Sequence, residues 1–384
     1  MRARSILAVL LLGFALACGG GSGSGGSGAT GSLTLRFGSD SFPGYDQAVV
    51  SVEKVEASTN GSTWMALGNV QATYDLMTLQ NGHSAALLSN IAVPPATYTQ
   101  FRITWATSNY AHPTTDPAAW VKPTGASIGQ SMSMPATTVI PGPVTVNSSA
   151  STTAQIMLSG QQPVQFRAGM ALPYTFQATG QAYDLSQTAS ITGKLTDGTT
   201  PLVGAEVYAE TVDGLQVATI QRRAFTDGTG SYLLECLPAG ASTAYFVVSQ
   251  PASTLSAYAA EASSPISTTA AATATANLAF SNAQQPGALT LTITPPSLPT
   301  VDTWGELRQN LSAGPGLLEN LIVRSQSAVT GASQDQVFFT GLAPNYYGVT
   351  AQRSTAGATP VTQTFPSQVP VSSGATATVS LSYP

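Results

Sequence analysis

Short runs in which apolar residues alternate with Ser or Thr recur along the whole chain. One run places Leu289, Leu291 and Ile293 two residues apart, with a Thr after each. A period of two sends alternate side chains to opposite faces of a β-strand and is typical of a sheet with one buried face. Gly, Pro, Asn and Asp separate the runs, which favours sandwiches or barrels. The pattern predicts an all-β protein of serial antiparallel β-sandwiches, with one short helix near residues 304–311.

The composition narrows the function classes. Only 8% of the 384 residues are Asp, Glu, Lys or Arg, and the formal net charge is −5, whereas about a quarter of an average protein is charged. No basic stripe is present to neutralise phosphates, so nucleic acid is not expected as a partner. The two histidines occur in no HExxH motif, and no CxxC pair or Asp-rich calcium loop occurs. The sequence predicts no catalytic residues, no metal site and no cofactor.

Residues 1–18 have the pattern of an export signal, which implies an extracytoplasmic protein. Arg2 and Arg4 precede an apolar run from Ile6 to Ala17. At about 1.5 Å per residue this run would span roughly 18 Å as a helix, too short for a hydrocarbon core of ~30 Å. Small residues before Cys18 resemble a bacterial lipobox, and the resemblance implies that a lipid is attached to Cys18. The alternative is an ordinary signal peptide that releases a soluble product.

A Gly/Ser-rich segment over residues 19–32 follows this cysteine. Such a segment is a flexible coil that holds a folded domain away from a membrane surface. Gly19 stands where an inner-membrane retention signal would have Asp, which resembles outer-membrane lipoproteins. We therefore expect an exported protein that is lipid-anchored to the bacterial envelope, at the outer membrane, with the membrane as a partner through its N-terminal anchor.

Cys236 is the other cysteine of the chain. With Cys18 lipidated it has no partner for an intramolecular disulfide. It lies in an apolar run that predicts a strand, so it is interpreted as a small core residue rather than a nucleophile, which would need a neighbouring base.

Three blocks follow the tether, at residues 33–185, 186–283 and 284–384. The first block contains Trp64 after a turn, the run Asp75 to Gly82, the run Pro95 to Ile103, and a Lys122–Gly125 segment. Over residues 32–165 it resembles the bacterial domain of unknown function 4382, whose members are largely lipoprotein ectodomains without a settled activity. Leu158-Ser159-Gly160-Gln161 replaces the acidic final strand of many members, so a cation-binding role is not carried over.

The second block resembles the carboxypeptidase regulatory-like domain, a sandwich of the transthyretin type. The runs that carry the resemblance are Ile191 to Gly198, Pro201 to Val207 and Thr226 to Tyr232. This domain is not the peptidase, so the resemblance implies no hydrolysis. The third block is similar to a more divergent transthyretin- or immunoglobulin-like sandwich.

All three blocks share a Pro-rich corner that is followed by a tyrosine. The tyrosines are Tyr98, Tyr245 and Tyr347, which follow Pro95, Pro238 and Pro344. A ring at such a corner can close the end of a sandwich while its hydroxyl bonds to nearby backbone. The device is interpreted as structural.

The loop from Ser108 to Pro123 carries the candidate binding residues Tyr110, His112 and Trp120. Long ordered loops are often functional, and exposed aromatics with few charges suit the apolar faces and hydroxyls of sugars. The alternative is that Trp120 folds back over the end of the sandwich. His83, in an Asn-Gly turn, is expected to be solvated.

Two further hypotheses concern charged residues of the second block. Lys194, Asn277 and Glu206 occupy positions that resemble the isopeptide-forming set of collagen-adhesin B-type domains. Because Ile191 and Leu195 should face inward, Lys194 should face solvent, which argues against this bond. The pair Arg222-Arg223 is expected to be solvated.

The sequence thus predicts a non-catalytic, envelope-anchored ectodomain. It would bind a ligand, either a glycan or an envelope protein, or would space an envelope assembly. The alternatives are a purely structural subunit of an envelope complex and a hydrolase with a cryptic site.

Overall fold

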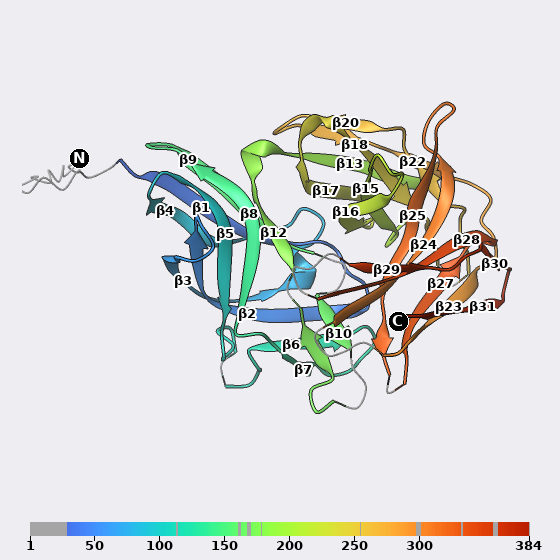
Figure 1. Ribbon diagram of the computed structural model, residues 1–384, viewed down its shortest axis with the longest axis horizontal. Coiled ribbons are helices and arrows are strands. Elements are labelled where there is room, and N and C mark those ends of the chain that lie inside the picture. Colours follow the sequence, from blue (N-terminus) through green and yellow to red (C-terminus); the bar gives the residue numbers. More distant parts are fainter. Residues whose placement is uncertain are drawn as a thin grey trace, which may run out of the picture.

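Each alternating block of the sequence forms a pair of β-sheets in the computed structural model (Figure 1). The structure describes residues 29–383 except 113, 160–162, 167–169, 178, 254, 297–300, 332 and 356–359, and at 241–243, 302 and 355 it describes the backbone alone. Cys18 and the signal segment lie outside the described residues. The predicted all-β fold is confirmed, since the helical elements within the described ranges are two short 3-10 turns, η1 (Leu76–Leu79) and η2 (Leu185–Gln187).

The first sandwich contains a four-stranded and an eight-stranded sheet. The smaller has the order β12 (Gly180–Asp184), β9 (Ser151–Leu158), β1 (Gly31–Ser39), β4 (Ala85–Val93). The larger has the order β10 (Val164–Phe166), β11 (Tyr174–Phe176), β7 (Gln130–Ser133), β6 (Ala119–Pro123), β2 (Tyr45–Ser58), β5 (Ala96–Trp105), β8 (Thr137–Val146), with β3 (Met65–Asp75) paired to β2. Phe101, Ile103 and Trp105 lie on one buried face, as their alternation predicts.

The second sandwich contains two five-stranded sheets. One has the order β14 (Thr200–Pro201), β13 (Thr188–Asp197), β17 (Ser231–Pro238), with β21 (Thr273–Thr275) and β22 (Leu278–Phe280) paired to β13. The other has the order β16 (Ala218–Phe225), β15 (Glu206–Val212), β18 (Gly240–Ser249), β19 (Glu261–Ala262), with β20 (Ile266–Thr268) paired to β18.

The third sandwich contains a four-stranded and a five-stranded sheet. The first has the order β26 (Val329–Thr330), β27 (Asp335–Leu342), β23 (Gly287–Thr294), β31 (Thr376–Ser382). The second has the order β25 (Leu318–Ser327), β24 (Val301–Ser312), β28 (Asn345–Thr355), β29 (Val361–Thr364), with β30 (Val369–Val371) paired to β28.

The three sandwiches share one topological feature. In each, the first strand pairs in parallel with a later strand of the same block: β1 with β9, β13 with β21 and β22, and β23 with β31. On its other side the same strand pairs antiparallel, with β4, β17 or β27. The opening strand of every sandwich is therefore an interior strand of its sheet.

The predicted tyrosine device is confirmed in all three sandwiches. Tyr98, Tyr245 and Tyr347 are 3%, 1% and 0% exposed, respectively. Their hydroxyls donate to backbone carbonyls of the preceding corner: Tyr98 to Pro94 at 2.8 Å, Tyr245 to Pro238 at 2.7 Å and Tyr347 to Ala343 at 2.6 Å. Each bond satisfies a polar group that burial of the ring would otherwise leave unpaired.

The predicted helix near residues 304–311 is wrong. These residues belong to β24, which pairs with β25 on one side and β28 on the other. Leu307 and Leu311 face the core, and their four-residue spacing imitates a helical face. Pairing on both edges of the strand overrides that local pattern.

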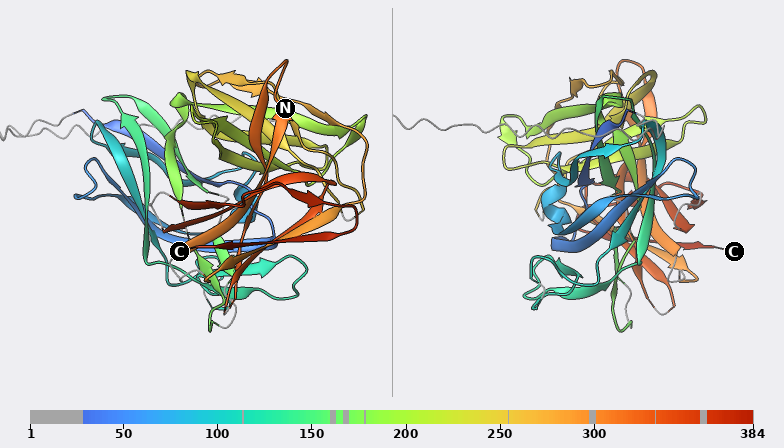
Figure 2. Two further views of the ribbon diagram at one scale, coloured as in Figure 1. Left: turned by 45° about the vertical axis from the view of Figure 1, so that its right-hand side comes forward. Right: turned by 90° about the vertical axis from the view of Figure 1, so that its left-hand side faces the viewer.

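The sandwiches cluster around a common centre, with the first at the left of Figure 1, the second at the upper right and the third below the second. The turned views agree with this grouping (Figure 2). Phe246 and Val248 of β18 belong to the same hydrophobic cluster as Leu321 of β25, so the second and third sandwiches share a core.

Candidate functional site

The structure separates the three residues predicted to bind a ligand. The Tyr110 hydroxyl donates to the Glu53 carboxylate of β2, and that bond is the main reason that the pKa of Tyr110 is raised. His112 is exposed. Trp120 lies half-buried in β6, and its ring fills the space that a side chain at Gly129 would need. Its indole N–H has no partner among the described residues. Among the described residues, no hydrogen bond, ion pair or ring contact joins any two of these side chains.

Asn109, which the sequence analysis did not single out, organises this loop. It is 1% exposed, and its Oδ1 accepts from the backbone N–H groups of Ala111 and His112, both at 2.9 Å. Its Nδ2 donates to the Pro117 carbonyl at 3.2 Å, and the Thr73 hydroxyl of β3 donates to its Oδ1 at 3.2 Å. An Asx turn signal before Ala111 and His112 could have indicated this role.

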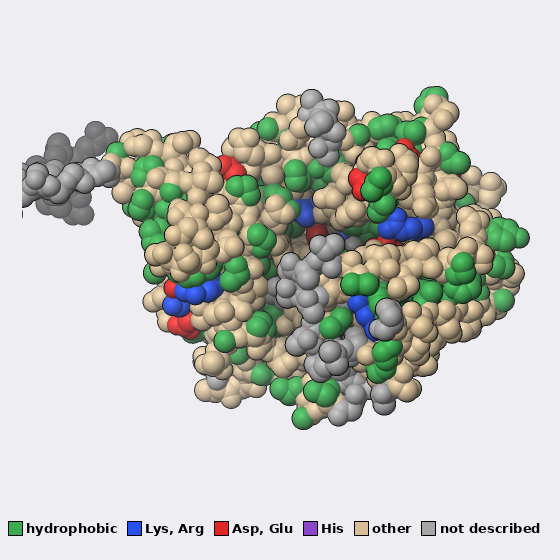
Figure 3. Space-filling view, in the orientation of Figure 1, with side chains coloured by type: hydrophobic (Ala, Val, Ile, Leu, Met, Phe, Trp, Pro, Cys, Tyr) green, Lys and Arg blue, Asp and Glu red, His purple; other side chains and the backbone are tan. Residues whose placement is uncertain are grey.

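The largest concentration of buried charge lies where the sandwiches meet. Figure 3 shows few charged side chains on the face it presents, with some of them in the hollow at its middle. The described buried or half-buried charged residues at this junction include Asp40, Glu206, Glu210, Arg222, Arg223, Glu235, Glu306, Arg308 and Arg324. Buried charges require partners, so their contacts determine what the junction can do.

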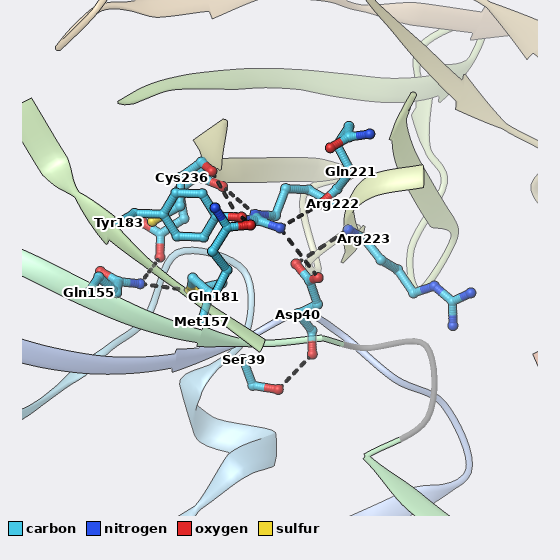
Figure 4. Close-up of polar contacts among 11 residues, drawn as sticks. Ser39, Asp40, Gln155, Met157, Gln181, Tyr183, Gln221, Arg222, Arg223 and Cys236 are labelled. Atoms are coloured by element: carbon cyan, nitrogen blue, oxygen red, sulfur yellow. Dashed lines mark hydrogen bonds and ion pairs between the residues drawn. The ribbon is translucent and has the colours of Figure 1, made fainter. Parts of the chain in front are cut away.

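Arg222 of β16 fastens the second sandwich to the first. Its Nε donates to the Glu235 carbonyl at 3.0 Å and its Nη2 to the Cys236 carbonyl at 2.9 Å, both on β17. Its guanidinium lies 3.9 Å from the Asp40 carboxylate and 4.6 Å from the centroid of the Tyr183 ring. Figure 4 shows the guanidinium between these two groups. Asp40 and Tyr183 belong to the first sandwich, so this side chain bridges the two.

Arg223 reaches the third sandwich instead. Its Nη2 donates to the Ser325 carbonyl of β25 at 2.7 Å, and its guanidinium lies 5.2 Å from the ring centroid of Tyr208. The expectation that Arg222 and Arg223 are solvated is wrong, because they are 8% and 5% exposed. A local sequence cannot show that two other sandwiches cover this strand.

Tyr208 and Glu210 of β15 link the second sandwich to β25. The Tyr208 hydroxyl donates to Glu206 at 2.5 Å and accepts from the Ser325 N–H at 3.3 Å. The Glu210 carboxyl accepts from the Ile322 N–H at 3.0 Å, and its Oε1 has no partner among the described residues. Burial is the main cause that raises the pKa of Glu210 to about 8, so at neutral pH the group is predominantly protonated.

Cys236 is confirmed as a buried free cysteine, 1% exposed, in a small cluster with Met157 and Tyr183. Burial raises the pKa of its thiol to about 12. A thiol with so little thiolate at neutral pH is a poor nucleophile.

Clefts remain around the junction. One of about 310 Å³ is lined by Asp40, Gln181 and Arg222, between the first two sandwiches. Another, of about 530 Å³, is lined by residues of all three sandwiches, including Pro43, Glu206 and Arg324. The second is within the size range of small-ligand sites.

The hypothetical isopeptide pair is not arranged for bond formation. The Asn277 carboxamide accepts from the backbone N–H of Lys194 at 2.9 Å, and the Lys194 side chain is exposed, as the alternation of its strand predicts. In the part of the chain that the structure describes, no group of three or more His, Cys, Asp or Glu side chains is placed to hold a metal ion. Within the same ranges, no helix is long and apolar enough to cross a bilayer.

Comparison with known proteins supports the N-terminal resemblance. Solved structures with similarity include the Bacillus anthracis TIE protein (12% identity, TM-score 0.21, 92% of this chain and 51% of that one). A second is the shaft pilin spaA from Lactobacillus rhamnosus GG, with 14% identity and a TM-score of 0.19 over 51% of this chain and 97% of the pilin. A third is a Streptococcal ancillary pilin, with 10% identity and a TM-score of 0.22 over 91% of this chain and 98% of that pilin. This chain thus spans about half the length of the TIE protein. No curated protein matches the sequence. Residues 30–179, which contain nearly all of the first sandwich, match the family described as "Domain of unknown function (DUF4382)".

Proposed function

We propose that this protein is a rigid, non-catalytic ectodomain that a lipid on Cys18 anchors to the outer membrane of a bacterial envelope. There it acts as a spacer or accessory part of an envelope assembly. The observation that carries the proposal is the junction, where buried polar side chains join sandwiches to one another. These side chains stabilise the packing of the sandwiches. The Arg222 guanidinium, for example, donates hydrogen bonds to two backbone carbonyls of β17.

Contacts that cross between sandwiches support rigidity. Asn81 of the first accepts from the Phe225 N–H of the second at 2.9 Å, and Gln155 donates to Glu235 at 2.7 Å. Between the second and third, Gln250 donates to the Tyr347 hydroxyl at 2.7 Å. Folding pays the conformational entropy of ordering these side chains, and in the folded protein the bonds then restrict the sandwiches to one arrangement.

The anchor is tested by labelling cells with a radioactive fatty acid. We expect label on the protein and none on a Cys18→Ser variant. A Ser32→Ala variant, changed beyond the lipobox, is the matched control and should label normally. Absence of label on the unaltered protein would favour the soluble alternative.

The rigid arrangement is tested by small-angle X-ray scattering of the chain without its first 28 residues, which carries no lipid and needs no detergent. We expect a profile that a single arrangement of the three sandwiches reproduces. A profile that requires a mixture of extended arrangements would refute the spacer of fixed shape.

Ligand binding by residues 108–123, the predicted loop whose last five residues form β6, is a second candidate function. Asn109 accepts hydrogen bonds from the backbone N–H groups of Ala111 and His112, and the His112 side chain is exposed. Because these bonds already order the backbone, less conformational entropy would be lost when a ligand binds. A glycan array and an envelope-protein pull-down test it. A Tyr110→Ala, Trp120→Ala variant should lose any signal, whereas a Thr107→Ala variant should keep it.

A further inference from the structure

The cleft of about 530 Å³ between the three sandwiches has an unusual charged wall. Its lining includes Pro43 of the first sandwich, Glu206 and Gln250 of the second, and Arg324 and Thr376 of the third. Because three separate parts of the chain build it, its shape depends on the complete fold. Sites at the meeting of domains are preferred places for small ligands.

Arg324 is the group in this wall that lacks a counter-ion. It is 6% exposed, and its hydrogen bond within the described part of the chain runs from Nη1 to the Val323 carbonyl at a long 3.4 Å. The ion pairs among the described residues do not include it, whereas Arg308 and Arg353 lie 2.7 Å and 3.0 Å from buried carboxylates. A buried guanidinium is expected to have an anionic partner. Because Arg324 lines the cleft, a ligand bound there could supply that anion.

The neighbours of Arg324 do not neutralise it. It lies close enough to Tyr208 and Tyr347 to lower the pKa of both hydroxyls, against the larger rise that burial causes. Both tyrosines are already hydrogen-bonded, Tyr208 to Glu206 and Tyr347 to Ala343. Glu206 lines the same cleft but makes no ion pair with Arg324 among the described contacts.

A second polar side chain in the wall has one atom without a hydrogen-bond partner. Gln250 is fully buried, and its Nε2 donates to the Tyr347 hydroxyl at 2.7 Å. Its Oε1 has no hydrogen-bond partner in the described part of the chain. Buried acceptors of this kind are normally satisfied, so a ligand hydroxyl that reached it would supply the missing donor.

We propose that this cleft binds a small, hydroxyl-rich monocarboxylate, of which a uronic acid is the chemical type, with Arg324 as the anchor of the carboxylate. Arginine presents a planar pair of donors that matches a carboxylate. The Glu206 charge in the same cleft disfavours a dianion such as a phosphate monoester. Gln250, Gln326 and Thr376 offer partners for hydroxyl groups.

The proposal is tested by calorimetric titration of the exported protein, purified whole in detergent. The probes are D-galacturonate, D-glucuronate, the methyl ester of D-galacturonate, D-galactose, Ala-Ala with a free carboxylate, and inorganic phosphate. We expect binding of at least one uronate, and at least tenfold weaker binding of the ester and the neutral sugar. The comparison of acid and ester uses the unaltered protein, so its result does not depend on whether a variant folds.

Arg324→Gln should weaken uronate binding at least tenfold with an unchanged unfolding midpoint. Arg36→Gln is the matched control, because Arg36 is exposed on β1 and bonds to Ser84. Thr376→Trp, at an exposed lining position, should block the cleft and weaken binding without altering the charge.

Equal binding of acid and ester, unchanged binding by Arg324→Gln, or no binding of any carboxylate would overturn the site. Binding of Ala-Ala but no uronate would overturn the assignment to sugars, and tighter binding of phosphate would overturn the preference for a single charge. The lipid anchor takes no part in these measurements, so their failure leaves the proposed spacer role unaffected.

Discussion

Glu210 accepts a hydrogen bond from the backbone N–H of Ile322 at 3.0 Å, across the interface between the second and third sandwiches. Burial raises the pKa of this carboxyl to about 8, Arg308 opposes the rise, and Glu306 adds to it. The unfolded chain would release the proton near the ordinary value of about 4.3. The interface is therefore built around an acid that is held in its neutral form.

The raised pKa of Glu210 predicts that the free energy of unfolding falls as the pH rises. Below about pH 4 the group is protonated in both states and contributes nothing to the pH dependence. Between there and pH 8 the native state holds a proton that the unfolded state has lost, so the free energy of unfolding decreases. Glu210→Gln should remove this dependence, leaving stability similar to the unaltered protein at pH 5 and higher by several kcal/mol at pH 9, since each pKa unit is worth about 1.36 kcal/mol.

Urea unfolding of both proteins at each pH measures the effect. Asp46→Asn, a change at a side chain that is 42% exposed, serves as the control and should follow the unaltered protein. A Glu210→Gln variant with the same pH dependence as the unaltered protein would show that the acid is charged or solvated.

The Asp40–Arg222 pair predicts coupling between the first two sandwiches. The two side chains are both 9% exposed and 3.9 Å apart. Arg222→Gln removes the bridge to two β17 carbonyls and leaves Asp40 buried without this counter-ion, so we expect a loss of about 3 kcal/mol in the free energy of unfolding. In the double variant with Asp40→Asn the losses should be less than additive. Strict additivity in the unfolding experiment would mean that the two groups do not interact.

Asn109 predicts local order in the long loop of the first sandwich. Asn109→Ala would leave the N–H groups of Ala111 and His112 without their acceptor. We expect a loss of about 1–3 kcal/mol in the local opening free energy of residues 109–117. Hydrogen exchange measures it, with the exposed Thr107→Ala as control. Faster exchange throughout the first sandwich would contradict a purely local role.

Cys236 predicts a thiol that is unreactive in the native state. It is 1% exposed and its pKa is raised to about 12. In a Cys18→Ser chain, iodoacetamide should label it only after denaturation. A cysteine introduced at exposed Ser108 should react at once and confirms that the reagent is active. Rapid labelling of Cys236 in the folded protein would show that β17 opens readily.

Local sequence patterns predicted much of the structure inside the sandwiches. Alternation identified the inward faces of the strands and the outward direction of Lys194, and the Pro-rich corners identified the three buried tyrosines. The local pattern was misleading at residues 304–311, where strand pairing on both sides decides the structure. The expectation for Arg222 and Arg223 also failed, because their burial depends on sandwiches that are distant in sequence. The junction and its cleft could not be predicted, since no local pattern records how sandwiches pack on one another.

The position of the opening strands has a mechanical consequence. β1 lies between β9 and β4 in its sheet, so a pull on Gly31 along the strand loads both rows of backbone hydrogen bonds together, in shear. An edge strand peeled from one end would break its bonds one at a time and yield to a smaller force. The first strand of the described chain is therefore arranged to resist a pulling force along its length.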